Sequence, residues 1–157
     1  IDDYSNLFSD NNWKFIKTRD DDYAYISKHF SKNFDIILID SLHEPEHVSK
    51  LIYTYWKHLK PNGSMYIDDI SWLPYMKDGW RGHKYTENIN RDTFNKILEI
   101  QLSNYDNIKL NFCFDGSGMC RMVKQNHREL NKPKLMKPRK YLIRKFLKKM
   151  VLLFKKN

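Results

Sequence analysis

One stretch near the middle of the chain switches between two hydrophobic periods, and this switch constrains the fold more than any other feature. Residues 34–43 read FDIILIDSLH and residues 64–70 read SMYIDDI, so each apolar run stops at an acidic residue. Apolar residues at helical spacing lie between the two runs. Continuous apolar strands are typical of parallel sheets that are covered on both faces. The stretch therefore predicts a strand at 34–39, a crossover helix at about 46–59 and a parallel neighbouring strand at 64–68.

The flanking segments predict further elements of an α/β fold. Alternation at 13–17 predicts a short strand, and three consecutive Asp residues predict the start of a helix over about 20–30. Residues 71–90 have no clear period and predict a long loop, which a helix at about 91–105 follows. Two apolar runs around a Gly-containing turn predict an antiparallel hairpin at 108–123. We expect a Rossmann-like doubly wound sheet, mostly parallel, that ends in this hairpin.

Carboxylates gather where the predicted parallel strands end. Asp40 and His43 follow the first strand, and Asp68 and Asp69 end the second. Ligands of open α/β sheets bind outside the carboxyl ends of the strands, so these four residues are expected in one cleft. The alternative for each is structural: Asp40 or His43 as a helix cap, and Asp68 and Asp69 as solvated turn residues. His47, one helical turn after His43, is interpreted as structural or exposed.

The positive charge is concentrated at the C-terminus. Residues 128–157 carry twelve of the 28 Lys and Arg residues but one of the 19 acids, which leaves 16 basic and 18 acidic side chains in 1–127. A nucleic-acid function inferred from the high isoelectric point alone would therefore be misplaced. The pattern predicts a globular domain at 1–125, a Pro-containing linker at 126–140 and a basic amphipathic helix at 141–157.

The predicted terminal helix has one apolar side, formed by Ile143, Phe146, Leu147, Met150 and Phe154, with Lys and Arg between them. A basic amphipathic helix is typical of a segment that lies on a membrane surface. The alternative is that its apolar side docks on this domain or on a partner. Nucleic acid is disfavoured, because it would leave the apolar side unexplained. No apolar run approaches the roughly 20 residues that span a bilayer, so a cytoplasmic location is expected, with peripheral membrane contact through this helix.

Two cysteines, Cys113 and Cys120, lie on either side of the predicted hairpin turn. Their spacing does not fit a metal site. Two free thiols are expected, and a disulfide across the hairpin is the alternative.

The order and spacing of three motifs carry a family resemblance: residues 34–43, residues 59–63 (LKPNG) and residues 66–69 (YIDD). Together they resemble class I S-adenosylmethionine-dependent methyltransferases. The resemblance covers about residues 1–124 and is strongest to the metal-dependent O-methyltransferase branch, which includes catechol, caffeoyl-CoA and macrolide-sugar enzymes. It implies methyl transfer to a hydroxyl oxygen, with a small molecule or sugar as acceptor.

The resemblance also implies roles by position. Asp40, Asp68 and Asp69 match carboxylates that hold a Mg²⁺-like ion, and His43 matches the position of a catalytic base, so Asp40 and His43 are the candidate catalytic pair. The chemistry agrees with this, because Mg²⁺ prefers oxygen ligands. The ion would lower the pKa of a bound hydroxyl, and an imidazole could take the proton.

One departure concerns the cofactor site. The family has a glycine-rich loop after its first strand, whereas no Gly precedes Gly63 here. The first strand and that loop are thus absent from this chain, and the resemblance begins partway through the cofactor site. If residues 1–2 end the second strand, Asp2 or Asp3 would match the acid that binds the cofactor ribose. Asp21 falls near the segment that approaches the adenine. A non-catalytic Rossmann-like module, recruited to membranes or partners by its basic tail, is the alternative function.

Overall fold

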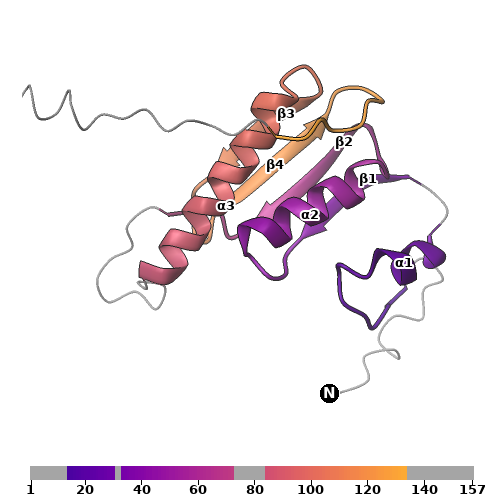
Figure 1. Ribbon diagram of the computed structural model, residues 1–157, viewed down its shortest axis with the longest axis horizontal. Helices are drawn as coiled ribbons and strands as arrows, with labels where there is room; N and C mark the ends of the chain where they lie inside the picture. Colours follow the sequence, from indigo (N-terminus) through magenta and orange to yellow (C-terminus); the bar gives the residue numbers. More distant parts are fainter. Residues whose placement is uncertain (1–13, 31–32, 73–83, 134–157) are drawn as a thin grey trace, which may run out of the picture.

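The computed structural model describes residues 14–30, 33–72 and 84–133, and these form a sheet with helices packed on it (Figure 1). In chain order the elements are α1 (Tyr23–Ile26), the 3-10 helix η2 (Ser27–His29), β1 (Phe34–Ile39), α2 (Pro45–Trp56), β2 (Leu59–Asp68), α3 (Lys84–Ser103), β3 (Ile108–Cys113) and β4 (Met119–Lys124). Figure 1 shows α2 and α3 side by side on the same face of the sheet.

The four strands form one mixed sheet in the order β1-β2-β4-β3. β1 and β2 are parallel, with Ile37 opposite Met65 and Ile39 opposite Ile67. β4 is antiparallel to both β2 and β3. This confirms the predicted parallel pair, its crossover helix and the C-terminal hairpin. Because the carboxyl ends of β1 and β2 are adjacent, the residues that follow them meet at one edge of the sheet.

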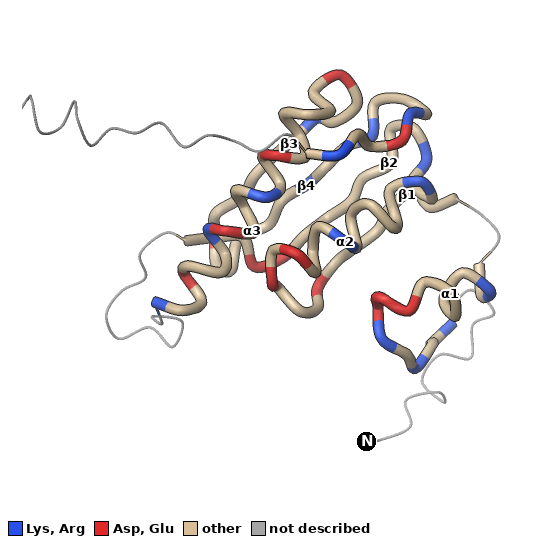
Figure 2. The backbone as a smooth tube through the Cα atoms, viewed as in Figure 1, with Lys and Arg blue, Asp and Glu red and all other residues tan. Residues whose placement is uncertain are grey.

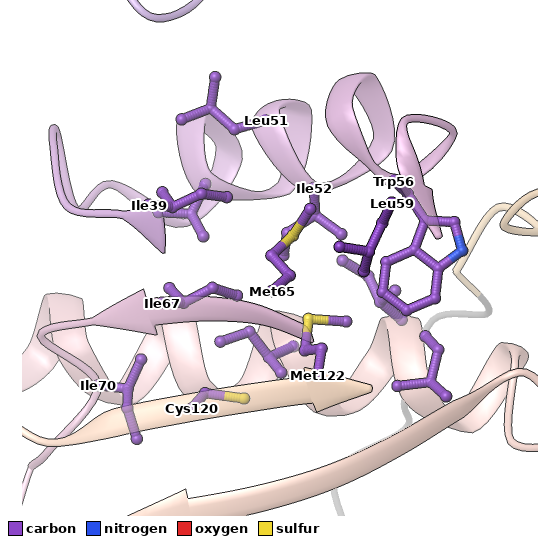
Figure 3. Packing of buried hydrophobic residues seen from close by; sticks show 14 residues of the cluster. Ile39, Leu51, Ile52, Trp56, Leu59, Met65, Ile67, Ile70, Cys120 and Met122 are labelled. Carbon is purple, nitrogen blue, oxygen red and sulfur yellow. The ribbon is translucent and has the colours of Figure 1, made fainter. Parts of the chain in front are cut away.

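The core lies between the sheet and the two long helices (Figure 3). Alternate residues of β2 and β4 point toward the helices, where Met65, Ile67 and Met122 are completely buried. Ile52 of α2, also completely buried, points toward Met65 from the helix side. On this face of the sheet every second strand residue is apolar, and these residues pack against the apolar side of α2.

β1 is an edge strand within the described part of the chain, and its other face is open. Ile36 and Leu38 point away from the helices and are 64% and 60% exposed. In register beside them, β2 presents Ser64 and Tyr66 on that face. The apolar surface is therefore carried mainly by β1.

β2 begins earlier than predicted. Residues 60–63, which lie between the predicted helix and the predicted strand, belong to this strand, and α2 ends at Trp56 and not at about residue 59. The extension is irregular: the register shifts between Phe34 and Ile36, and Asn62 has a positive φ of 64°. Proline is found in strands at such irregular positions because it cannot donate to the ladder. Residues 61–63, a Pro-Asn-Gly sequence, therefore lie in an irregular part of β2 and do not separate it from the helix.

Two other predictions differ from the structure. Residues 14–17 form no strand, and Phe15 is 75% exposed. None of the four described strands pairs with this segment, and alternation without such hydrogen bonds does not make a strand. α3 begins at Lys84, so residues 84–90 are helical and not a loop. The helix predicted near 20–30 is present, with Asp22 as its N-cap, and it continues as the 3-10 helix η2.

A buried lysine joins the end of α2 to the sheet. The Lys124 ammonium donates hydrogen bonds to the carbonyls of Trp56, at 3.0 Å, and Leu59, at 2.8 Å. Only 4% of Lys124 is exposed, and burial lowers its pKa below the ordinary value. Its positive charge lies where the helix dipole is negative, which favours the contact.

Both cysteines are free thiols, as expected, with Cys113 exposed and Cys120 buried. The register places Cys120 opposite Phe112, so the two thiols lie on different faces of the hairpin. The predicted strand end at 1–3 and the predicted helix at 141–157 lie outside the described residues. Residues 126–133, the start of the predicted linker, are fixed to the domain, for example by the Asn131 amide, which donates to Asn104 Oδ1 at 2.7 Å. Among the described helices, none is long and apolar enough to cross a membrane.

Candidate active site

The candidate site lies where β1 and β2 end. Asp40 follows the last residue of β1, and His43 lies in the loop that leads to Pro45, the first residue of α2. Asp69 follows the last residue of β2. Figure 2 shows acidic residues gathered where the loop after β1 leads into α2. The parallel pairing thus brings together side chains that are far apart in the sequence.

The His43 ring lies close to two carboxylates. Its Nε2 atom is 3.2 Å from Asp69 Oδ2 and 3.9 Å from Asp40 Oδ1. His43 and Asp69 are about equally accessible, at 28% and 29%, while Asp40 is 60% exposed. The site is therefore partly enclosed, with Asp40 on its solvent side.

Asp69, which lies beside His43, has an unusual backbone conformation. Its φ is 56°, in the left-handed region that few residues other than Gly adopt. Asp tolerates this region better than most residues, although the conformation costs roughly 1–2 kcal/mol. Backbone strain of this kind is concentrated at functional sites, where the surrounding structure maintains it.

Asp68 has a different partner. The Ser117 hydroxyl donates a hydrogen bond to Asp68 Oδ1 at 2.9 Å. Ser117 lies in the β3–β4 turn, whose backbone also binds the residues after β2: the Ser71 amide donates to the Ser117 carbonyl at 2.9 Å, and the Ile70 amide donates to Gly118 at 3.2 Å. Asp68 thus connects the hairpin to the site, a role that the sequence did not indicate.

Two buried polar side chains of α3 hold the loops of the site. The Thr93 hydroxyl donates to the His43 carbonyl at 2.8 Å, and the Asn90 amide donates to the Ser71 carbonyl at 2.9 Å. Thr93 is completely buried and Asn90 is 3% exposed. Sequence reasoning missed both residues, and their only signal was the presence of polar side chains at i and i+3 in a helix.

The acidic turn before α1 is bound to α2. Asp21, a predicted cofactor-binding residue, pairs with Lys50 and Arg19, and hydrogen bonds from these two lower the pKa of Asp21 to about 2. Its neighbour Asp20 contacts His47 Nε2 at 3.1 Å. Burial would raise the pKa of Asp20, but hydrogen bonding and the charge of His47 together lower it. His47 therefore anchors this turn, which agrees with its structural interpretation.

A cavity of about 400 Å³ lies between β1 and residues 16–30. Its lining is mostly apolar and includes Ile36 and Leu38. Asp20, Asp40 and Ser41 are the polar exceptions. The cavity thus follows the free edge of β1 and reaches the site at Asp40.

The donor atoms at the site fit a hard cation only in part. Asp40 and Asp69 each place a carboxylate oxygen near the same atom, His43 Nε2. Mg²⁺ is commonly bound by one or two carboxylates with water and substrate. Asp68 already accepts a hydrogen bond from Ser117. No group of three His, Cys, Asp or Glu side chains in the described residues is arranged to hold a metal ion.

Comparison with known proteins finds a family model that matches part of the chain. A family model described as a methyltransferase domain matches residues 3–70, which include β1, α2 and β2. No curated protein is significantly similar to the chain.

Solved structures share the fold. A Staphylococcus aureus protein described as a caffeoyl-CoA O-methyltransferase aligns with a TM-score of 0.55 at 16% identity, over 77% of this chain and 56% of that one. A Podospora anserina methyltransferase with SAH bound aligns with a TM-score of 0.57 at 15% identity, over 78% of this chain and 53% of that one. The chain spans little more than half the length of either structure.

The described sheet and helices therefore have the Rossmann-like α/β fold of methyltransferases. The family model agrees with the predicted resemblance to methyltransferases over residues 3–70, and these structures agree with the fold that the resemblance implied.

Proposed function

We propose that the chain is part of a methyltransferase that transfers the methyl group of S-adenosylmethionine to a hydroxyl oxygen of a small molecule or sugar. The observation that carries the proposal is the contact of His43 with Asp69 and Asp40 at the ends of adjacent parallel strands. The family model and the fold support the cofactor class. The acceptor class is taken from the sequence resemblance.

When bound, S-adenosylmethionine supplies an electrophilic methyl group on sulfur. The carboxylate of Asp69 faces His43 Nε2 and can only accept a hydrogen bond, so it would keep the proton of the neutral ring on Nε2. The other ring nitrogen, Nδ1, would then accept the proton of the acceptor hydroxyl, because imidazole is the side chain whose ordinary pKa lies nearest neutrality. Asp69 and Asp40 would orient the ring and stabilise the imidazolium that forms. With its proton on His43, the acceptor oxygen would be able to take the methyl group that the cofactor supplies, and the electron pair of the C–S bond would stay on the cofactor sulfur.

Metal assistance is the finer part of the proposal. Asp40 and Asp69 would hold a Mg²⁺-like ion, which would lower the pKa of the acceptor hydroxyl when bound. Asp68, also predicted as a ligand, would position the site through Ser117. For the cofactor, Asp2 and Asp3 remain the proposed ribose ligands and lie outside the described residues. Asp21 remains a proposed adenine contact, although its carboxylate is already paired.

The test is methyl transfer by the complete gene product. Purified protein is incubated with S-adenosylmethionine labelled in its methyl group and with a panel of catechols and sugars, and labelled product is counted. His43→Gln should lower the rate by roughly 10²- to 10⁴-fold, the usual contribution of a general base. His127→Gln is the matched control, because His127 is exposed and lies beyond β4 at the far end of the sheet.

Two outcomes would contradict parts of the proposal. Full activity of His43→Gln would remove His43 as the base. Unchanged activity in a chelator, or of an Asp40→Ala/Asp69→Ala double variant, would remove the metal. Absence of both cofactor binding and methyl transfer in the parent protein would favour the non-catalytic module.

A further inference from the structure

α3 crosses both loops that carry the candidate active site, and it contacts each through a buried polar side chain. Thr93 binds the backbone of His43 itself, and Asn90 binds the backbone of Ser71, two residues after Asp69. These two side chains are three residues apart on α3 and therefore lie on the same helix face.

Burial makes these two contacts energetically important. A buried hydroxyl or amide without a hydrogen-bond partner is strongly unfavourable, so each side chain holds its carbonyl in place. Neither contact stabilises α3 internally, because each acceptor belongs to a loop at the end of a different strand. The helix fixes the distance between Asn90 and Thr93. Their hydrogen bonds therefore also fix the distance between the two loop carbonyls that they bind.

We propose that Asn90 and Thr93 are positioning residues that set the separation of His43 and Asp69. The catalytic part of this inference rests on the proposed function. The contact itself is short enough for the positions to matter, at 3.2 Å between His43 Nε2 and Asp69 Oδ2. The hairpin also holds this loop, through the hydrogen bond that the Ser71 amide donates to the Ser117 carbonyl.

The first test measures the contact without using activity. The NMR signals of the His43 ring are assigned as those that disappear in His43→Gln. The shift that Asp69→Asn causes in these signals is then measured twice, once in the parent protein and once in the Thr93→Val protein. In the parent, Asp69→Asn should shift these signals, because Asp69 is in contact with the ring. In Thr93→Val, which keeps the branched shape but removes the donor, the shift should fall by about half or more.

The controls separate positioning from general destabilisation. Thr93→Ser keeps the hydroxyl and should restore the parent response. Ser103→Ala removes a hydroxyl from the same helix that donates to Glu99 within that helix, so it should leave the response unchanged. If Thr93→Val does not fold, the same shift is measured in Thr93→Ala and in Asn90→Leu, with the same expected decrease.

The second test uses activity. Misplacement by about 1 Å can cost roughly 100-fold in rate, so Thr93→Val and Asn90→Leu should each lower kcat by roughly 10- to 100-fold with little change in the KM for cofactor. A folded Thr93→Val or Asn90→Leu with the full NMR response would overturn the inference. Absence of methyl transfer in the parent protein would refute the proposed function. The NMR result alone would then decide whether Asn90 and Thr93 position His43 and Asp69.

Discussion

Replacing Gly118 with Ala should destabilise the fold through a direct clash. Gly118 lies in the β3–β4 turn with φ at 79°, and a Cβ atom there would lie 2.6 Å from both the backbone N and the Cβ of Ser71. Ser71 is completely buried and is held by Asn90, so it has little room to move.

The expected magnitude has two parts. Any non-Gly residue in the left-handed region costs about 1–2 kcal/mol. Forcing an extra carbon into a packed site costs about 1–3 kcal/mol more. Gly118→Ala should therefore lower the free energy of unfolding by about 2–5 kcal/mol.

Gly116 provides a matched control in the same turn. Its φ is 61°, but a Cβ atom there would meet nothing within 4 Å. Gly116→Ala should thus show the backbone cost alone, about 1–2 kcal/mol. The difference between the two variants isolates the clash with Ser71.

Urea unfolding followed by circular dichroism measures both variants. The midpoint should fall more for Gly118→Ala than for Gly116→Ala, with similar m-values. Equal losses in the two variants would refute the reasoning, because they would mean that Ser71 and the hairpin separate at no cost.

Three further predictions concern other parts of the chain. Lys124→Met should lower stability by about 1–3 kcal/mol at neutral pH, because two buried carbonyls lose their donor. Burial lowers the folded-state pKa of Lys124, so the unfolded chain binds this proton more tightly. The free energy of unfolding of the parent should therefore rise with pH between that lowered pKa and 10.5, the ordinary pKa of a lysine. Urea midpoints measured across this pH range should rise for the parent but not for Lys124→Met. Iodoacetamide should modify Cys113 and spare Cys120 in the folded protein, since burial raises the pKa of Cys120 to about 12; mass spectrometry showing both thiols modified at equal rates would contradict this. If the basic helix predicted at 141–157 contacts membranes, anionic vesicles should pellet the full chain better than a version ending at Arg139, with a difference that shrinks as salt rises. Equal pelleting of the two would leave docking on the domain or on a partner.

The elements that sequence reasoning located well are those whose signals are local. β1 is apolar except for Asp35, and its predicted bounds match Phe34–Ile39. The hairpin was marked by a Gly-containing turn between two apolar runs. The convergence of Asp40, His43 and Asp69 followed from one topological rule, the adjacency of parallel strand ends.

What the sequence did not reveal depends on contacts between distant segments. The first turns of α3 lack an apolar period because Asn90 and Thr93, which are polar, occupy buried positions there. Their partners are backbone carbonyls of loops, and no residue type marks a carbonyl that needs a donor. The hydrogen bond from Ser117 to Asp68 is hidden for the same reason, since 49 residues separate the two.

The open edge of β1 has a consequence for handling the protein. Among the described strands, β1 pairs on one side only, and its Ile36 and Leu38 face solvent. A row of unpaired backbone groups beside exposed branched side chains is a template for strand addition between copies. The residues FDIILI carry a single charge and no Pro or Gly, a composition typical of segments that self-associate. Residues 1–157 produced alone should therefore aggregate with rising concentration through this strand, and a Lys at position 36 or 38 should suppress that aggregation without entering the core.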